Sequence, residues 1–258
     1  MSANVTRLVR MGWLPLTVGM IWWFATAGSQ SFYFPPLHQI LDVFAHDWLS
    51  RRVVSDLLPS LRNLALGFLV AGLFGISFGM LVGSVNWLGK MTAPLIHFVR
   101  SMPPPVFLPI ALIVAGTGTT MKVLIIAVGA TWPTVLNAMD GVRGVDPQLR
   151  RMARVYGLNR SERVRHVILP SAAPQIMAGL RTTLQYSIML IVVSEMVAST
   201  GGIGYYVLMS QQTFAVPETW AGTLLLGLIG FSCAVLFLAV EKRALFWQYD
   251  MRAQSQKG

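Results

Sequence analysis

The sequence predicts an all-α integral membrane protein with about six transmembrane helices. Of its 258 residues, 54% are hydrophobic and only 12% are charged, and the mean hydropathy is +0.60. Several apolar stretches approach the roughly 20 helical residues that cross about 30 Å of hydrocarbon. The connections between them are short and leave no room for a soluble module. We therefore expect one membrane domain over residues 1–258.

Hydropathy and periodicity give the order of the expected helices. The predicted spans are 12–27, 61–82, 106–115, 122–138, 179–198 and 219–240. The third is short, and the prolines at 103–105 forbid regular helix directly before it, although a proline is accepted at the first helical position. The Gly-Thr-Gly-Thr-Thr stretch at 116–120 predicts a tight connection to the fourth span.

The first apolar stretch allows two interpretations. Arg7 and Arg10 precede an apolar run that ends in Ala-Thr-Ala at 25–27, which also resembles a cleavable secretory signal. Trp22 and Trp23 suit an interfacial anchor better than the apolar core of a leader. We expect a retained span, and cleavage stays an open alternative.

The distribution of cations predicts the orientation. A six-span topology places most cations on one side, namely Arg7, Arg10, Lys90, Arg100, the arginines from 143 to 181, Lys242, Arg243, Arg252 and Lys257. The other side keeps Arg51, Arg52, Arg62 and Lys122. The positive-inside rule makes the first side, with both termini, cytoplasmic. Because topology accounts for the net charge of +10, no nucleic-acid partner is expected.

The connection over about 140–178 is rich in arginine, and its pattern predicts two short helices. Asp146 followed by Pro147 is an N-cap with proline at the first helical position, and Gly157 is a natural stop. A second helix is expected from the possible N-cap Ser161 to residue 168, before Pro170 ends it. The apolar stripe of the first helix is Leu149, Met152, Ala153 and Tyr156, with arginines 150, 151 and 154 on other faces.

An amphipathic helix of this kind has two possible roles. It could lie on the membrane, with its arginines on anionic headgroups and its stripe in the acyl boundary. It could instead insert its stripe into a groove of a soluble partner. Periodicity alone does not choose between them.

The same stretch resembles the cytoplasmic signature loop of permease subunits of bacterial binding-protein-dependent ABC importers. The loop, DPQLRRMARVYGLNRSERVRHVILPSAAP, matches that pattern through its glycine and its Leu-Pro pair. Ala153, Gly157, Leu169 and Pro170 stand at signature positions. Arg151 replaces the signature glutamate and Met152 its first alanine, so a specific salt bridge from the loop is in doubt.

Other segments are similar to the nitrate, sulfonate, taurine and pyrimidine-precursor branch of that family. They include FVRSMPPPVFLPI, AGLRTTLQYSIMLIVVSEMVAST and GGIGYY. The resemblance implies a type I ABC importer permease fold in the bacterial inner membrane and a second permease copy across the pathway. It also implies two ABC ATPase subunits that carry ATP and Mg²⁺, and a periplasmic or lipid-anchored binding protein. The implied solute is a small anion or polar organic molecule.

The residues independently give no sign of an enzyme. No lysine precedes serine or threonine, so the chain has no Walker A loop, and hydrolysis is expected in a partner. The histidines at 38, 46, 97 and 166 are scattered, and Cys233 is the single cysteine. Neither a metal site nor a disulfide is expected, and we predict no cofactor in this chain.

An ion-coupled secondary transporter is the competing function. Such a protein needs ionisable residues within the membrane and often has repeated broken helices. Glu195 is the only acidic residue deep in a predicted span, and no convincing inverted repeat is found.

Two further sets of residues are predicted to matter. The pathway candidates are Met102, Pro103, Thr182, Gln185, Met189 and Met196, which combine polar and adaptable side chains with a proline-rich turn. Glu195 instead shares a helical face with apolar residues and should be buried. Because an unpaired buried carboxylate is costly, we expect an ion pair with Lys122 or Arg62.

Overall fold

The computed structural model describes residues 13, 17–29, 31–50 and 52–248, and within these ranges it contains helices and no strands. Residues 17–26 are helical. The elements that follow are α2 (Leu37–Trp48), η1 (Val53–Leu57), α3 (Leu58–Ser84), α4 (Asn86–Ser101), η2 (Pro104–Phe107), α5 (Leu108–Ala115), α6 (Thr119–Gly129), α7 (Trp132–Arg143), α8 (Pro147–Val155), α9 (Arg160–Arg163), η3 (Val164–Ile168), α10 (Leu169–Ala198), α11 (Ile203–Gln212) and α12 (Val216–Ala244). Gly12 and residues 14–16 of the first predicted span lie outside the described residues, as do Arg7, Arg10, Arg51, Arg252 and Lys257.

The long helices confirm the all-α membrane class. Among the described residues, four helical stretches are long and apolar enough to cross a membrane: Val53–Ser84, Thr119–Arg143, Arg160–Ala198 and Val216–Ala244. They contain the second, fourth, fifth and sixth predicted spans. A bent pair, Asn86–Ser101 with Pro104–Ala115, adds a fifth crossing if its two parts are counted together.

The third predicted span is wrong as a single straight helix. The helix α5 has 8 residues and covers only about 12 Å, whereas α4, which the hydropathy pattern missed, has 16 residues. The two helices meet at an angle of 97°. Lys90, His97 and Arg100 lower the hydropathy of α4, and the prolines from 103 to 105 force the bend.

Pro170 does not end the second short helix, contrary to the sequence prediction. The five residues before Leu169 form the π-helical turn η3, in which the Leu169 N–H reaches back to the Val164 carbonyl. The wider turn accommodates the proline ring and its missing N–H, and the helix continues into α10. Residues 169–178, expected in the loop, are therefore the first turns of a long helix.

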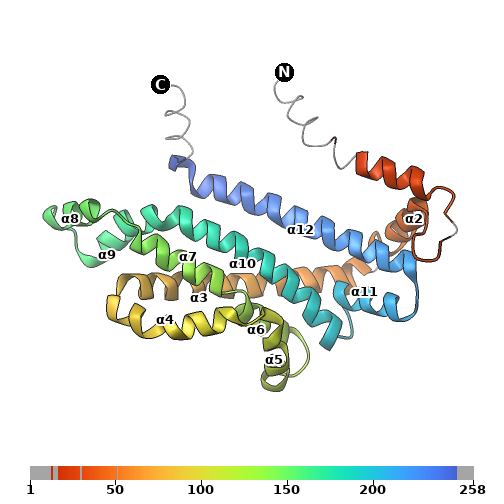
Figure 1. Cartoon of the computed structure of the whole chain (residues 1–258), viewed down its shortest axis with the longest axis horizontal. Helices are drawn as coiled ribbons and strands as arrows, with labels where there is room; N and C mark the ends of the chain where they lie inside the picture. Colours follow the sequence, from red (N-terminus) through yellow and green to blue (C-terminus); the bar gives the residue numbers. More distant parts are fainter. Residues whose placement is uncertain (1–12, 14–16, 30, 51, 249–258) are drawn as a thin grey trace.

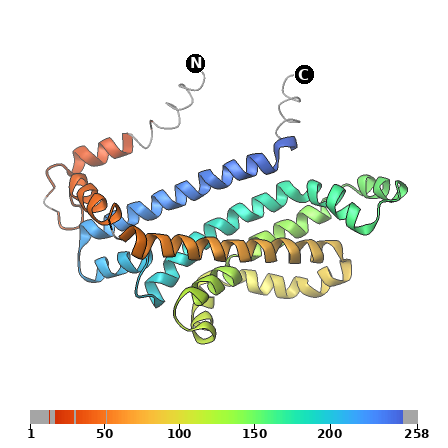
Figure 2. The same cartoon turned by 180° about the vertical axis from the view of Figure 1, so that it is seen from behind.

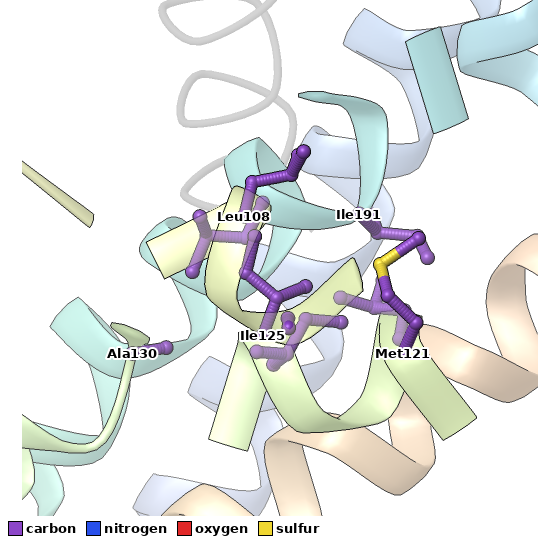
Figure 3. Packing of buried hydrophobic residues seen from close by; sticks show 9 residues of the cluster. Leu108, Met121, Ile125, Ala130 and Ile191 are labelled. Atoms are coloured by element: carbon purple, nitrogen blue, oxygen red, sulfur yellow. The ribbon is translucent and has the colours of Figure 1, made fainter. Parts of the chain in front are cut away.

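The helix α3 packs closely because it carries glycines on one face. A Cβ at Gly75 would lie 2.8 Å from Thr134, and one at Gly79 would lie 2.5 Å from the Val135 carbonyl oxygen. Such small residues allow the backbones of α3 and α7 to approach. The largest buried cluster lies beside this contact and joins α5, α6 and α10 through Leu108, Met121, Ile125, Ala130 and Ile191 (Figure 3).

The bundle has two distinct ends. Figure 1 shows α8 and α9 at one end, beyond α7 and the start of α10, and shows α2 and α11 at the other. Figure 2 shows α3 extending from the end with α2 to the end with α4. We call these the α8 end and the α11 end.

Candidate functional site

The helix α8 is fixed at both termini by its own sequence. The Asp146 carboxylate accepts a hydrogen bond from the Gln148 N–H at 2.7 Å, as its N-cap position predicts. Gly157 has a φ of 71°, and the Leu158 N–H donates to the Ala153 carbonyl at 3.1 Å. This Schellman-type ending needs the left-handed conformation that glycine adopts without strain. The result is a short, well-defined helix at the tip of the bundle.

The outer face of α8, defined as Leu149, Met152, Val155 and Tyr156, is apolar and exposed. These side chains are 43%, 54%, 86% and 76% exposed, respectively. Val155 was not part of the predicted stripe, although its position three residues after Met152 places it on the same side of the helix. Arg151, Gly157 and Leu169 are also exposed, and Pro170 is half-buried.

The predicted stripe is wrong at Ala153. This residue is only 4% exposed and lines a cavity with Met80 and Leu81 of α3. Because the loop folds back against the end of α3, the side of α8 that carries Ala153 is covered by the same chain. Ser161 is not the cap of the second helix either, since Asn159 and Glu162 form a capping box there.

Glu195 lies in a buried polar network near the α11 end. Its side chain is 1% exposed. Its Oε1 accepts a hydrogen bond from the Ser60 hydroxyl at 2.6 Å and lies 3.3 Å from the Lys122 Nζ. The structure therefore brings Lys122, but not Arg62, to this carboxylate: the Arg62 guanidinium donates to the Thr119 hydroxyl at 3.1 Å.

The same network holds the first turn of α11. Oε2 of Glu195 accepts from the Gly204 N–H at 3.1 Å, and the Asp56 carboxylate accepts from the Gly202 N–H at 2.8 Å. The Ser60 hydroxyl oxygen accepts from the Ile203 N–H at 3.3 Å. Carboxylates at a helix N-terminus satisfy free N–H groups and complement the helix dipole. Sequence reasoning missed Asp56 and Ser60, and the glycine-rich Gly-Gly-Ile-Gly run was the only local signal.

A cavity of about 370 Å³ lies where α4 and η2 meet the junction of α6 and α7. Met102, Arg100, Trp132 and Tyr186 are among its lining residues. Since Trp132 lies near the middle of the Thr119–Arg143 stretch, the cavity is about halfway along the bundle. The sequence groups Arg100 with the cations of the α8 end, whereas α4 carries it away from that end to this cavity.

Of the pathway candidates, Met102 alone lines this cavity. Gln185 is exposed, Met189 is 43% exposed, and Thr182 and Met196 are half-buried on α10. Tyr186 lies four residues after Thr182 on the same helical face and lines the cavity, so spacing could have identified it. Pro103 is exposed beside the cavity wall and does not line it.

The profile of the family described as "Binding-protein-dependent transport system inner membrane component" matches residues 72–244. The chain belongs to this family. It is 30% identical over 200 residues to the putative aliphatic sulfonates transport permease protein SsuC of Bacillus subtilis, covering 78% of this chain and 72% of the relative. It is 28% identical over 258 residues to the taurine transport system permease protein TauC of Escherichia coli, covering 98% and 93% of the two chains.

A solved structure supports the fold. The permease superposes on a chain of the MetNI methionine ABC transporter in inward-facing conformations with a TM-score of 0.60 and 20% identity, over 73% of this chain and 95% of the other. The chain is thus a membrane permease subunit of an ABC importer, a class that acts with an ABC ATPase and a binding protein. This assignment removes the ion-coupled secondary transporter as an alternative.

The α11 end of the permease carries a second, open polar pocket, of about 830 Å³. In it, the Tyr206 hydroxyl donates to the Asp47 carboxylate at 2.7 Å, and the Arg52 guanidinium lies 4.8 Å from the centre of the Tyr206 ring. Burial raises the pKa of Asp47, but hydrogen bonds from Tyr206 and His46 and the charge of Arg52 outweigh it, so the pKa is lowered. Burial and the contact with Asp47 raise the pKa of Tyr206. These contacts join α2 to α11.

Tyr206→Phe is expected to destabilise the joint between α2 and α11 by about 1–2 kcal/mol, because it removes a hydrogen bond to a carboxylate. The lowered pKa of Asp47 gives stability that is present above the ordinary carboxyl pKa and lost as pH falls below it. Between about pH 7 and pH 3, the unfolding temperature of the purified variant should therefore fall less than that of the wild-type permease. Tyr205→Phe removes a neighbouring hydroxyl outside this contact and serves as the control. Equal effects of the two changes would contradict the assignment.

Proposed function

We propose that this permease conducts a small anionic solute across the bacterial inner membrane, from the α11 end outside to the α8 end in the cytoplasm. We infer an anionic solute from Arg100, because its side chain lines the cavity midway along the bundle. In the described part of the chain no carboxylate pairs with it. A cation at membrane depth is costly unless a solute or partner compensates it. The names of SsuC and TauC, which specify aliphatic sulfonates and taurine, agree with a solute that carries an anionic sulfonate group.

The orientation is supported by charge. The α8 end carries the arginines of the loop together with Lys242 and Arg243, as the positive-inside rule requires of a cytoplasmic surface. Both termini would then lie in the cytoplasm. A periplasmic or lipid-anchored binding protein would deliver the solute at the α11 end.

The outer face of α8 is the proposed docking site for the ATPase. Three exposed apolar side chains on a helix of 9 residues, with that of its C-cap Tyr156, form a compact surface that a partner groove could bury. Two such ATPase subunits would hold ATP and Mg²⁺ and supply the hydrolysis. An apolar face suits a protein groove and an acyl boundary equally, and the family of ABC importer permeases, which act with an ATPase, favours the protein groove.

Two copies of the permease would enclose the pathway. The candidates Gln185 and Met189 lie exposed on α10, on the turn that carries the cavity-lining Tyr186, and so need a second surface to form a closed passage. A homodimer supplies that surface by symmetry. The decisive experiment reconstitutes the permease with its ATPase in vesicles and measures ATP hydrolysis and uptake with a panel of binding proteins loaded with nitrate, sulfonates, taurine or neutral solutes. Stimulation by neutral solutes alone would refute the anion assignment.

Arg100→Gln is expected to lower uptake of the anionic solute by roughly tenfold or more, because charge-assisted contacts are worth more than neutral ones. Assembly with the ATPase should be unchanged, since Arg100 lies far from the α8 end. The matched control is Lys90→Gln, which removes an exposed cation near the other end of the same helix. Uptake at the wild-type rate in the Arg100 variant would show that this cation does not serve the pathway.

A further inference from the structure

A cavity of about 550 Å³ lies between the last turns of α3, the inner face of α8 and the start of the helix formed by α9 and η3. Its polar lining is almost entirely cationic. Arg150 and Arg154 come from α8, and Arg160 and Arg163 come from α9. No aspartate or glutamate is among the described residues that line it. Such a concentration of one charge in a half-enclosed space favours an anionic ligand.

The arginines are not neutralised within the described ranges. None of the four forms an ion pair there; the cations that do so are His46, Arg52, Lys122 and Arg181. An Nη of Arg150 donates to the Val142 carbonyl, which fixes the side chain, while its buried Nε has no hydrogen-bond acceptor. A buried donor without a partner is rare in native structures. The Arg150 side chain is therefore fixed by one hydrogen bond, while its Nε–H stays available to a ligand.

This cavity and the proposed ATPase surface lie on opposite sides of α8. At about 100° per residue, Arg150, Ala153 and Arg154 fall on one side of the helix. The outer face, which includes Met152 and Val155, falls on the other. An ATPase bound to the outer face would therefore not need to fill the cavity.

An apolar groove lies close to the arginine cavity. It has a volume of about 540 Å³ and runs between α3, α10 and α12, with Ile76, Leu180 and Phe237 in its walls. Ile76 and Leu180 pack in one cluster with Met80 and Ile168, which line the arginine cavity. The cationic cavity and the apolar groove thus lie on two sides of one small cluster of apolar side chains and share no lining residue.

We propose that the arginine cavity binds the phosphate of an anionic membrane lipid, with an acyl chain of that lipid in the apolar groove. Guanidinium groups bind phosphate oxygens through paired N–H donors, and basic pockets at the cytoplasmic membrane surface suit phosphate headgroups. An amphiphile satisfies both parts of the site, whereas free phosphate satisfies only the arginines. The bound lipid would connect α8 to α3 and so position the loop.

The test measures lipid binding to the purified full-length permease in detergent by native mass spectrometry during titration with phosphatidylglycerol. Arg154→Gln combined with Arg163→Gln removes two cavity arginines. The matched control, Arg151→Gln with Arg165→Gln, removes the same charge from exposed residues of the same segment that do not line the cavity. We expect the cavity variant to bind about tenfold or more weakly and the control to change by no more than about twofold.

Four outcomes would overturn the proposal. They are equal losses in the two variants, equal binding of phosphatidylcholine, displacement of the lipid by millimolar inorganic phosphate, and loss of the lipid when the ATPase binds. Displacement by phosphate would indicate a site for the free ion, and loss to the ATPase would assign the arginines to that partner. If the cavity variant does not fold, the wild-type protein decides. A phosphatidylglycerol with a photoreactive headgroup should then crosslink within residues 147–168, and crosslinks only elsewhere would refute the site.

Discussion

Met152→Glu is expected to abolish co-purification of the ATPase with the permease while leaving the permease in the membrane. Met152 is 54% exposed at the centre of the apolar outer face of α8. A carboxylate there is harmless in the free permease but would be buried without a partner in a close-packed groove. We expect affinity to fall at least about hundredfold, because an unpaired buried charge costs several kcal/mol. The measurement is the ATPase to permease ratio after purification in detergent, where no bilayer surface remains.

Arg151→Glu is the control for Met152→Glu, since it introduces the same side chain on the preceding residue, at the edge of the outer face instead of its centre. Arg151 is exposed, and its change should weaken ATPase binding far less. Normal ATPase recovery and normal solute-stimulated hydrolysis with Met152→Glu would exclude the outer face of α8 as the docking surface. Ala153→Glu would not test this surface, because Ala153 is only 4% exposed and lines the cavity on the other side of α8.

Ala153 also shows where periodicity stops being informative. The spacing of Leu149, Met152, Ala153 and Tyr156 correctly predicts an amphipathic helix, and Asp146 and Gly157 correctly predict its ends. Spacing cannot say which residues at the edge of a stripe face a partner and which face the chain itself. That depends on the path of the loop, which returns α8 to the end of α3.

The helix α4 shows a second limit. Hydropathy finds α3, α10 and α12 because each is apolar over most of its length. It misses α4, because Lys90, His97 and Arg100 divide a helix that nevertheless lies against the others. A polar residue that faces a pathway resembles one that faces water, so the functional part of a transporter is the part that hydropathy describes least well.

In the Glu195 network, one contact could be predicted from the sequence and two could not. A carboxylate on an otherwise apolar face predicts a buried cation partner, and the pair with Lys122 follows from the cost of an isolated charge. The contribution of Asp56 and Ser60 cannot be predicted in this way. They lie more than a hundred residues away in the sequence, and only the packing of η1 and the start of α3 against α10 and the first turn of α11 brings them to the same place.

Glu195→Gln is expected to destabilise the permease by about 3–5 kcal/mol, because it leaves the Lys122 ammonium buried without its counter-ion. Lys122 is only 7% exposed, so water cannot replace the carboxylate. The first turn of α11 should loosen as well, since the Gly204 N–H loses a charged acceptor. The measurements are thermal unfolding and amide hydrogen exchange across residues 200–212.

The variant that distinguishes pairing from simple loss of packing is Lys122→Met in the Glu195→Gln background. Removing the second charge should restore much of the stability, so that the two changes are far from additive. Arg62→Gln removes an exposed cation that contacts Thr119 instead and should have little effect. Additive losses in the double variant, or a loss in Arg62→Gln as large as that in Glu195→Gln, would show that Lys122 is not the counter-ion. Because Glu195 holds both a cation of α6 and the N-terminus of α11, the rescued variant should recover its unfolding temperature more fully than its exchange protection in α11.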